Sequence, residues 1–453
     1  MSTNPIPDDG LTRSVFLRRA GMGAVALSVP SLLAACGSDS STGKGEKSAK
    51  AAAESLPQGP FSFLNSLDPG APLTKAFDEQ RDAWNASHAD EQVTFENAPF
   101  ANFLAAATTR ARANKLEDVV QLLAGQAYKP LFPALLELDK ASFGPAGEQL
   151  TGWGTTIGSA DKPDVSIAVP MGSVGVVWYY NRELFERADL DPDAPPESWD
   201  DFTAAARTLK AEGTVPIGMS GVDSYFAWWM WNSFSPQFFT TDEDLLSVLS
   251  GETKLTDPRM LQSLEPIKET FDNGWWNPDY RDQEFADVEA KFGKGEVAMV
   301  SGLTTDIAHW QIWDRELGRE KYGSFVAPQL PVAEERGLFY NPSQMLGISK
   351  RTEVEGTARE WCEFLTSKEV QTALLRGAGQ FPNRTDIDVG AVTGSKGAQG
   401  LADLVKEYDG GINSVQNQFN AGATGLVFQK LTTAITSGDL EGFLGDLQRQ
   451  QEQ

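Results

Sequence analysis

The sequence predicts an α/β protein made of two lobes, and three observations support this prediction. About 420 of the 453 residues remain once an N-terminal leader is set aside, whereas single hydrophobic cores stop growing at about 250–300 residues. Hydrophobic residues make up 41% of the chain and aromatic residues 10%, as in a protein with a well-packed core. Short apolar segments alternate with helical patterns, which predicts parallel sheets covered by helices.

The first 35 residues have the layout of an export signal. Three arginines within residues 1–19 precede an uncharged stretch at residues 20–35, which is too short to span a bilayer. Cys36 ends the stretch LAAC, which resembles the lipobox of bacterial lipoproteins. The resemblance implies cleavage before Cys36 and lipidation of its thiol, and a free thiol after an ordinary signal is the alternative. The small, polar residues 36–57 predict a flexible tether.

Charge and residue usage exclude several classes of protein. The net charge of −25 argues against a nucleic-acid partner, because binding to phosphates depends on Lys and Arg. With Cys36 lipidated, Cys362 has no partner for a disulfide, and helical spacing predicts that it is a buried core thiol. His88 and His309 are far apart in sequence and belong to no zinc-binding motif. We therefore expect no metal and no cofactor.

The chain after the tether begins with a strand–helix pattern. Apolar segments followed by turns or helical spacing predict strands at residues 61–66 (FSFLNS), 92–98 (QVTFENA) and 117–125 (EDVVQLLAG). A helix is expected between each pair, the second of them at residues 101–115. This order predicts a parallel sheet.

The remaining elements follow from the same signals. A strand at residues 165–172 continues through Gly172 and Gly175 into VVWYYNRELF, and Ser198 begins a helix. Thr366 and Glu369 form a capping-box pattern at the start of another helix. Further strands are expected at residues 296–302 and 322–331, and residues 337–350 (GLFYNPSQMLGISK) lead into a return strand. Two amphipathic stretches at residues 425–438 and 439–450 close the sequence.

Four stretches resemble the family 1 extracellular solute-binding proteins, the maltose-binding-protein-like subunits of sugar ABC importers. They are residues 176–218, 292–302 (FGKGEVAMVSG), 356–371 (GTAREWCEFLTSKEVQ) and 379–386 (GQFPNRTD). In the first stretch Ser198 stands where the family usually has threonine. The resemblance extends from about Phe61 to the C-terminus.

The resemblance implies the two-lobed periplasmic-binding-protein fold, type II-like, in which each lobe is a mostly parallel sheet with flanking helices and a cleft lies between the lobes. Crossings between the lobes would lie near residues 170–176, 327–338 and 386–394. The implied organisation is a signal peptide at 1–35, a tether at 36–57, an N-terminal lobe at 58–172 plus 330–388 and a C-terminal lobe at 173–329 plus 389–453.

The resemblance also implies a function. We expect a lipid-anchored, monomeric substrate-binding protein, not an enzyme, on the outer face of the cytoplasmic membrane. It would bind a mono- or oligosaccharide in the cleft and deliver it to the transmembrane subunits of an ABC permease. A polyamine or peptide binder is the closest alternative, because acidic and aromatic sites also suit cations. An anchored glycoside hydrolase would need a carboxylate pair, and no motif selects one.

Candidate ligand contacts follow from the rule that ligands of parallel α/β lobes lie beyond the carboxyl ends of strands. The residues selected by this rule are Asn65, Ser66, Asp68, Gly125, Gln126, Gly302, Leu303 and Thr304. Asp68 has a second interpretation as a helix cap. Asn341, Ser343 and Gln344 precede the return strand and have an equal interpretation as turn residues, and Arg384 is a further candidate.

Aromatic residues supply the remaining candidates. Adjacent tyrosines such as Tyr179 and Tyr180 bind ferric iron in another class of solute-binding protein, so iron is a further alternative, and one of the pair could face the cleft. In residues 225–234 (YFAWWMWNSF) the rings surround the helix axis, which fits either a fully buried helix or stacking on a sugar. We expect ligand contacts from one ring of each adjacent tryptophan pair, with an asparagine close by: Trp228 or Trp229, Trp275 or Trp276, and Asn232.

Overall fold

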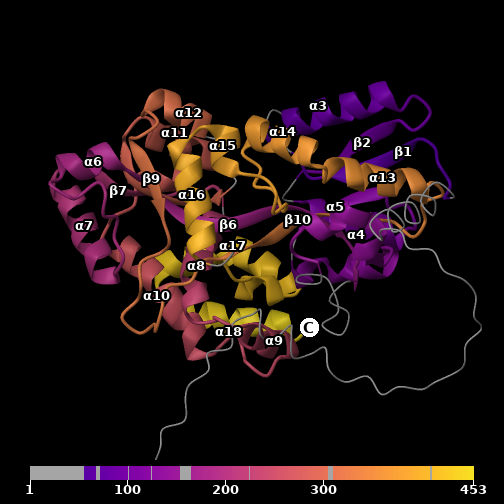
Figure 1. Cartoon of the computed structure of the whole chain (residues 1–453). Coiled ribbons are helices and arrows are strands. Elements are labelled where there is room, and N and C mark those ends of the chain that lie inside the picture. The colour runs from indigo at the N-terminus through magenta and orange to yellow at the C-terminus, as the bar shows by residue number, and fades with distance from the viewer. Residues whose placement is uncertain are drawn as a thin grey trace, which may run out of the picture. The chain divides into compact units, whose positions relative to one another are not determined.

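The predicted α/β architecture is present (Figure 1). The computed structural model describes residues 56–67, 72–99, 102–123, 125–153, 165–223, 225–304, 310–408 and 411–453. The predicted signal peptide, Cys36, nearly all of the predicted tether and Asp68 lie outside these ranges. Within them, no helix combines the length and the apolar character needed to cross a membrane.

Strands and helices alternate along the described chain. The strands are β1 (Phe61–Asn65), β2 (Val93–Asn97), β3 (Val119–Leu123), β4 (Leu138–Asp139), β5 (Val165–Ser166), β6 (Val169–Asn181), β7 (Val215–Gly218), β8 (Val297–Leu303), β9 (Tyr322–Phe325) and β10 (Tyr340–Ile348). The α-helices are α3 (Pro72–Ser87), α4 (Phe103–Arg112), α5 (Gly144–Gln149), α6 (Arg182–Arg187), α7 (Trp199–Ala211), α8 (Tyr225–Phe234), α9 (Asp242–Ser250), α10 (Pro258–Asp272), α11 (Phe285–Gly293), α12 (Trp310–Glu316), α13 (Glu355–Leu365), α14 (Lys368–Ala378), α15 (Val389–Thr393), α16 (Lys396–Glu407), α17 (Ala421–Ser437) and α18 (Leu440–Gln451). Two 3-10 helices are important for the site, η2 (Gln126–Ala134) and η7 (Val415–Gln418).

The first three strands form the predicted parallel sheet. Strand β1 lies between β2 and β3, with Phe61 opposite Val93 and Phe63 opposite Val119. The predicted strand–helix order is thus confirmed for this part of the chain. Because parallel strands run in one direction, the carboxyl ends of β1 and β3 lie at the same edge of the sheet.

Strand β6 connects the two halves of the sheet. Its first half pairs with β10, where Gly175 lies opposite Tyr340, and its second half pairs with β8 and β9 from Val176 onward. The strand order is β2-β1-β3-β10-β6-β8-β7. The pairs around β6 are antiparallel, whereas β7 and β8 are parallel. The sheet is therefore more mixed than the mostly parallel sheets expected, because one strand serves both halves.

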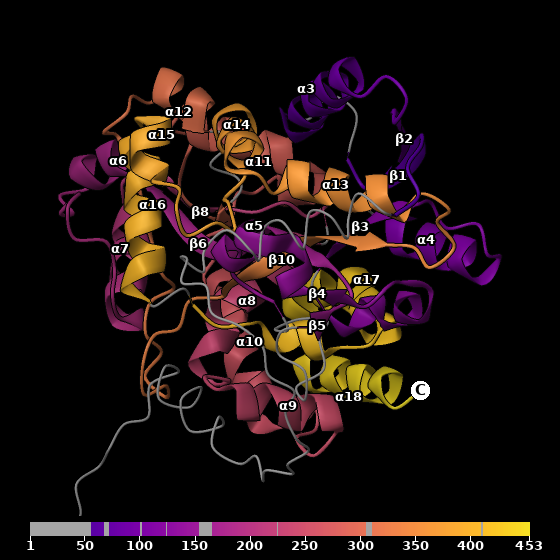
Figure 2. The same ribbon diagram turned by 45° about the vertical axis from the view of Figure 1, so that its right-hand side comes forward.

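Buried apolar side chains gather in three clusters. The largest surrounds the second half of β6 and includes residues of β8, α7, α8, α10 and α17. The other two lie on opposite faces of β1, β3 and β10, as the alternation of Phe63 with Leu64 requires. Figures 1 and 2 show α13 and α14 on one side of β10 and α17 on the other. We call the first of these sides the α14 face.

The α14 face contains the second cysteine. Cys362 is fully buried on α13 next to Trp361, whose indole ring meets Phe61, Phe63 and Trp84. Burial raises the pKa of the Cys362 thiol far above its usual range. The prediction of a buried core thiol is confirmed.

One predicted helix cap is present in the structure, and another is displaced by one residue. The Ser198 hydroxyl accepts a hydrogen bond from the Asp201 amide at 3.1 Å and begins α7 as predicted. Helix α14 is capped by Ser367, which accepts from the Val370 amide at 3.2 Å. The predicted cap at Thr366 is wrong by one residue, because the Thr366 hydroxyl donates to a carbonyl at the end of α13 instead.

Candidate functional site

Uncharged polar side chains lie on the α14 face, toward the side of the sheet where the parallel strands β1 and β3 end. Phe63 of β1 and Leu346 of β10 belong to the core under α14. Because strand side chains alternate between faces, Asn65, Gln121 and Gln344 lie on the same face, each two positions from a member of that core. Asn65 ends β1, whereas Gln121 and Gln344 lie in the middle of β3 and β10, and β10 is the neighbour of the crossing strand β6.

Ser66 is hydrogen-bonded to Gln121, and Asn65 precedes Ser66 at the end of β1. The Gln121 Oε1 accepts from the Ser66 amide at 3.0 Å and from the Ser66 hydroxyl at 3.3 Å. The Asn65 Oδ1 accepts from the Leu67 amide at 3.2 Å. All three side chains are buried, and the Asn65 Nδ2 has no partner among the described residues. The group therefore holds one free donor at the end of β1.

Gln380 lies over the crossing strand. Gly172 is paired with Gln344 and forms an isolated bridge with Pro382. A Cβ atom at Gly172 would lie 1.8 Å from the Gln380 Nε2, so the amide of Gln380 occupies the space left by the missing side chain. Gln380 is 1% exposed, and within the described chain neither of its amide atoms has a partner.

Asn383 extends the group along the same loop. The Ser173 amide donates to the Phe381 carbonyl at 3.1 Å, and the Ser173 hydroxyl donates to the Asn383 Oδ1. The Asn383 Nδ2 is buried without a partner among the described residues. Burial raises the pKa of the nearby Tyr340 to about 12, and a hydrogen bond with Ser173 opposes this rise. Tyr340 is therefore a neutral hydroxyl at physiological pH.

A second set of carboxamides connects β10 to the segment before α17. The Asn413 Oδ1 accepts from the Asn341 Nδ2 at 2.6 Å and from the Asn417 Nδ2 at 2.7 Å. A Cβ atom at Gly125 would lie 3.1 Å from the Asn417 carbonyl. Gln126, a predicted contact, follows Gly125 and begins η2. The end of β3 and the start of β10 thus both lie beside η7.

Ser414 links this set to α8. The Ser414 hydroxyl contacts the Asn232 Oδ1 and the Gln416 Oε1. The Asn232 Nδ2 donates to the Trp228 carbonyl at 3.1 Å, and the half-buried Trp228 ring meets Phe428 of α17 at 5.2 Å between centroids. Two predicted residues, Asn232 and Trp228, are therefore connected to the carboxamides through α8.

Hydrogen bonds join the end of β8 to the crossing strand β6. The Thr304 Oγ1 accepts from the Gly175 amide at 3.0 Å, and the Tyr179 hydroxyl donates to the Leu303 carbonyl at 2.8 Å. Gly302 is part of the same β8–β6 ladder. These predicted residues lie at the crossing, and their polar groups join strands there.

Two other polar candidates point to different parts of the molecule. The Tyr180 hydroxyl donates to the Pro192 carbonyl at 2.9 Å, so the two adjacent tyrosine hydroxyls do not meet at one point. The Arg384 guanidinium donates to both oxygens of Asp386 and to the Thr366 carbonyl. Arg384 is therefore neutralised locally and fixes its own loop.

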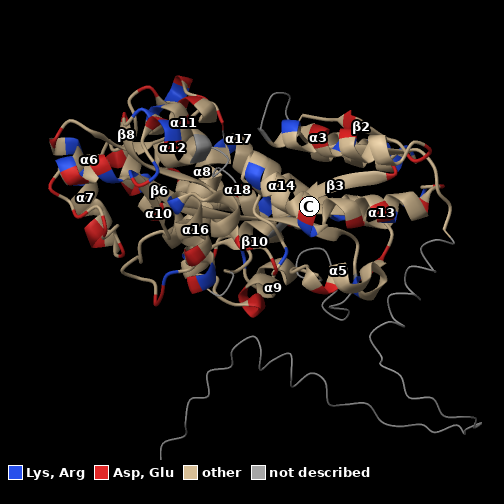
Figure 3. Cartoon of the chain, turned by 45° about the horizontal axis from the view of Figure 1, so that its top comes forward, with Lys and Arg blue, Asp and Glu red and all other residues tan. Residues whose placement is uncertain are grey.

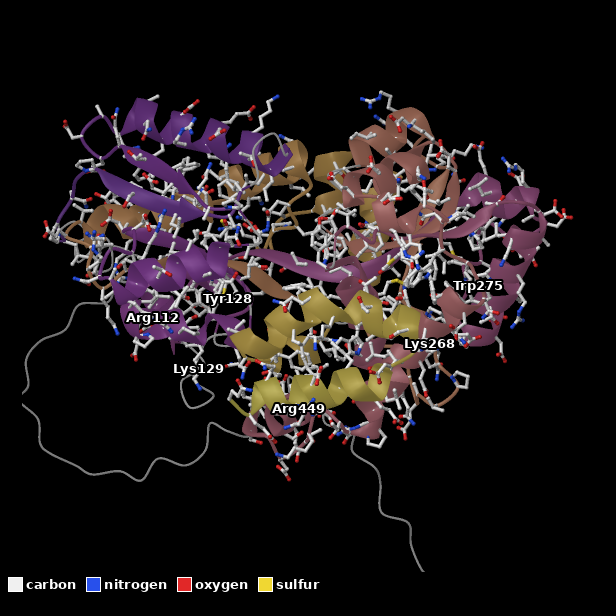
Figure 4. All side chains as sticks on the ribbon, turned by 180° about the vertical axis from the view of Figure 1, so that it is seen from behind. Arg112, Tyr128, Lys129, Lys268, Trp275 and Arg449 are labelled. Atoms are coloured by element: carbon white, nitrogen blue, oxygen red, sulfur yellow. The ribbon has the colours of Figure 1, made fainter. Side chains whose placement is uncertain are left out.

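The structure corrects the assignment of Trp275 and Trp276. Trp275 is 1% exposed and faces Phe202 inside the largest core cluster. The Trp276 Nε1 donates to the Thr270 hydroxyl at 2.8 Å. Figure 4 shows Trp275 far from Tyr128 of η2, on the other side of the described chain. Both rings fill the core because α7 and α10 cover them, so we exclude them from the site.

Trp229 also has a packing role. Its ring is 7% exposed and meets Phe285 edge-to-face at 5.1 Å between centroids, with Tyr225 at 4.8 Å. Of the tryptophan pair on α8, Trp228 is thus the ring with free surface.

Six side chains at this place contribute seven buried polar atoms without a partner in the described part of the chain. Within the described residues they include the Nδ2 atoms of Asn65 and Asn383, the Oδ1 of Asn341, the Oε1 of Gln344, both amide atoms of Gln380 and the Nε2 of Gln416. Such atoms are rare in proteins because their desolvation is costly. Donors and acceptors are both present, which suits a ligand rich in hydroxyl groups.

Two cavities lie elsewhere. One of about 800 Å³ is lined by charged residues of α6 and by Lys294 and Glu316, at the end of β6 away from the crossing. The other, of about 200 Å³, lies beside Arg336 and Tyr408. Neither is lined by the carboxamides with free atoms, so the unpaired atoms, and not a cavity, identify the site.

Residues 65–372 match the family of bacterial extracellular solute-binding proteins. The chain belongs to this family.

Relatives and solved structures agree with this assignment. The sn-glycerol-3-phosphate-binding periplasmic protein UgpB of Yersinia enterocolitica is 24% identical over 322 residues, which cover 67% of this chain and 70% of that protein. A solved chitin oligosaccharide binding protein is similar with a TM-score of 0.76 at 17% identity, covering 87% of this chain and 98% of that one. The SBP RafE in complex with raffinose gives 0.68 at 19% identity, covering 86% and 98%. The structural matches confirm the two-lobed fold.

Several clustered residues of this solute-binding protein were not predicted from its sequence. They are Gln121, Gln380, Asn383, Asn413, Gln416 and Asn417. Gln121 was detectable as the one polar residue in the strand VVQLL. The others lie in two segments, GQFPNRTD and NSVQNQFN, whose amide content was a usable signal.

Proposed function

We propose that this protein is the substrate-binding subunit of an ABC importer, that it binds a mono- or oligosaccharide between its two lobes, and that it delivers the sugar to the permease. One observation carries the proposal: uncharged carboxamides and hydroxyls gather around β3, β10 and the neighbouring strand β6, where Ser66 bonds Gln121, Asn341 bonds Asn413, and Ser414 bonds Asn232. Such groups hydrogen-bond sugar hydroxyls without needing a charged ligand. Membership of the family supports the importer role.

The lobes in this proposal are residues 58–172 plus 330–388 and residues 173–329 plus 389–453. The first half of β6 pairs with one lobe and the second half with the other, which supports a boundary near Gly172. Ligand bound to both lobes stabilises the closed form, because contacts to both are made only there. The permease then recognises the closed, loaded monomer.

A thermal-shift screen tests the sugar assignment. Binding to the native state alone should stabilise the protein by about 2.7 kcal/mol at a hundredfold excess over Kd. We expect this shift with at least one of raffinose, a chitin oligosaccharide, a xylo-oligosaccharide, D-galactose and D-tagatose. Stabilisation by spermidine, peptides or ferric iron alone would contradict the proposal. Release of product from chromogenic glycosides would show an enzyme instead.

The proposal includes a lipid anchor at Cys36. The stretch LAAC after an apolar leader supports it, and the extracellular description of the family supports export. We expect Cys36→Ala to move the protein from the membrane fraction to the soluble exported fraction. Sugar affinity should not change, because the tether separates Cys36 from the fold. Mass analysis of the mature N-terminus is the direct measurement, and an unmodified Cys36 in the wild-type protein would exclude the anchor.

A further inference from the structure

Three carboxamides meet at the crossing strand from separate parts of the chain. Gln344 comes from β10, and Gln380 and Asn383 come from the loop after α14. Gly172 lies between them: it pairs with Gln344 and leaves room for the amide of Gln380. Together they hold four buried amide atoms with no partner in the described chain.

Gln380 differs from a second buried glutamine, Gln371, in having both amide atoms free of any partner within the described ranges. Gln371 on α14 is also buried and its Oε1 also has no partner among the described residues, but its Nε2 donates to the Leu365 carbonyl at 2.9 Å. Gln380 makes no comparable bond although it is equally enclosed. A core under selection for stability alone would have an apolar side chain here, because a buried amide without a partner is destabilising. The free atoms therefore indicate hydrogen bonds to something outside the described chain.

The charged groups near these amides indicate whether the bound partner is neutral or charged. Strands β3, β6 and β10 contain no Lys, Arg, Asp or Glu, and Figure 3 shows them without blue or red. The nearest cation in the loop, Arg384, is paired with Asp386 at 2.8 Å. A phosphate would lose its hydration without gaining a counter-charge, which is unfavourable, whereas neutral hydroxyls fit both donors and acceptors.

We propose that Gln380, together with Gln344 and Asn383, is a specificity-determining part of the ligand site, which hydrogen-bonds the hydroxyls of an uncharged sugar and does not accept a phosphate ester. This inference depends on the proposed function, because it names residues and a ligand class for the same site. It separates this chain from the relatives described as binding sn-glycerol 3-phosphate.

The test compares two variants of the crossing with a matched control. Gln380→Met removes the amide at nearly constant volume. Gly172→Ala retains the amide but forces it to move, because the new methyl group would overlap the Gln380 Nε2. Gln371→Met is the control, a buried glutamine on the same helix–loop segment but bonded within α14 and its neighbour α13. Calorimetric affinities are measured for the sugars of the screen and for sn-glycerol 3-phosphate.

We expect the wild-type protein to bind a neutral sugar and not sn-glycerol 3-phosphate. Gln380→Met and Gly172→Ala should each weaken sugar binding about tenfold, the loss expected for one or two neutral hydrogen bonds. Gln380→Met should keep or raise the melting temperature of the ligand-free protein, whereas Gln371→Met should lower it and leave affinity within twofold.

The outcomes separate this inference from the proposed function. If the wild-type protein binds none of the sugars, the proposed function fails. If it binds a sugar and both crossing variants keep wild-type affinity, only the role of Gln380 is overturned. Binding of sn-glycerol 3-phosphate to the wild-type protein would overturn the charge selectivity.

Discussion

Trp229→Ala should lower the free energy of unfolding by about 3–5 kcal/mol, the usual result of truncating a buried tryptophan. The Trp229 ring is almost fully buried and packed against Phe285 and Tyr225, so its loss leaves a cavity. The adjacent Trp228→Ala should instead act mainly on binding. Its ring keeps free surface beside Phe428, and loss of a stacking ring should weaken sugar binding by about 2 kcal/mol, roughly 30-fold.

Denaturant unfolding and calorimetry on both variants measure the two effects separately. Each variant is the control for the other, because both remove the same side chain from the same helix. Equal affinity of Trp228→Ala and the wild-type protein would remove Trp228 from the site. A stability loss below 1 kcal/mol for Trp229→Ala would contradict its packing role.

Gly175→Ala is expected to destabilise the protein by about 1–3 kcal/mol, as overpacking usually does. A Cβ atom at Gly175 would lie 2.4 Å from the Phe339 carbonyl oxygen, and backbone cannot move aside as a flexible side chain can. The strain arises at the point along β6 where its pairing partner changes from β10 to β8. We therefore expect sugar affinity to decrease together with stability.

Gly400→Ala is the matched control for this prediction. Gly400 lies within α16 with open space around its missing side chain. Alanine there should stabilise the protein by about 0.5–1 kcal/mol through helix propensity. Chemical unfolding of both variants measures their free energies of unfolding. An unchanged free energy of unfolding for Gly175→Ala would contradict the prediction and show that the strands at the crossing can move apart without cost.

The sequence was sufficient where local pattern decides structure. Strands β1 to β3 were predictable because their apolar runs are short and bounded by turns, and α7 because Ser198 is a strong cap. Pairing across the crossing was not predictable, since β10 lies between β3 and β6 in space but follows both in the chain. In the sequence Thr366 resembled a helix cap as well as Ser198 did. Its hydroxyl donates to a carbonyl of α13 instead, which the sequence alone does not reveal.

The site was predictable in part for the same reason. Asn65 ends a strand, and Ser66 and Thr304 each follow one, so the rule about strand ends located them. Gln380 and Asn413 follow helix α14 and helix α16, where no strand marks their place, and long-range folding brings them in. Trp275 illustrates the opposite error, because a tryptophan pair before Asn-Pro has the same sequence whether α7 covers it or not.

The position of β10 in the sheet has a consequence for biogenesis. Gln121 of β3 pairs with Leu346 of β10, and Leu346 also pairs with Val169 of β6. The amino-terminal half of the sheet therefore stays incomplete until the ribosome has made about three quarters of the chain. Proteins whose strands pair across long sequence separations fold slowly, and their unpaired strand edges stay exposed until the late strand is in place. An export pathway that accepts unfolded chains would have a long interval in which to capture this one.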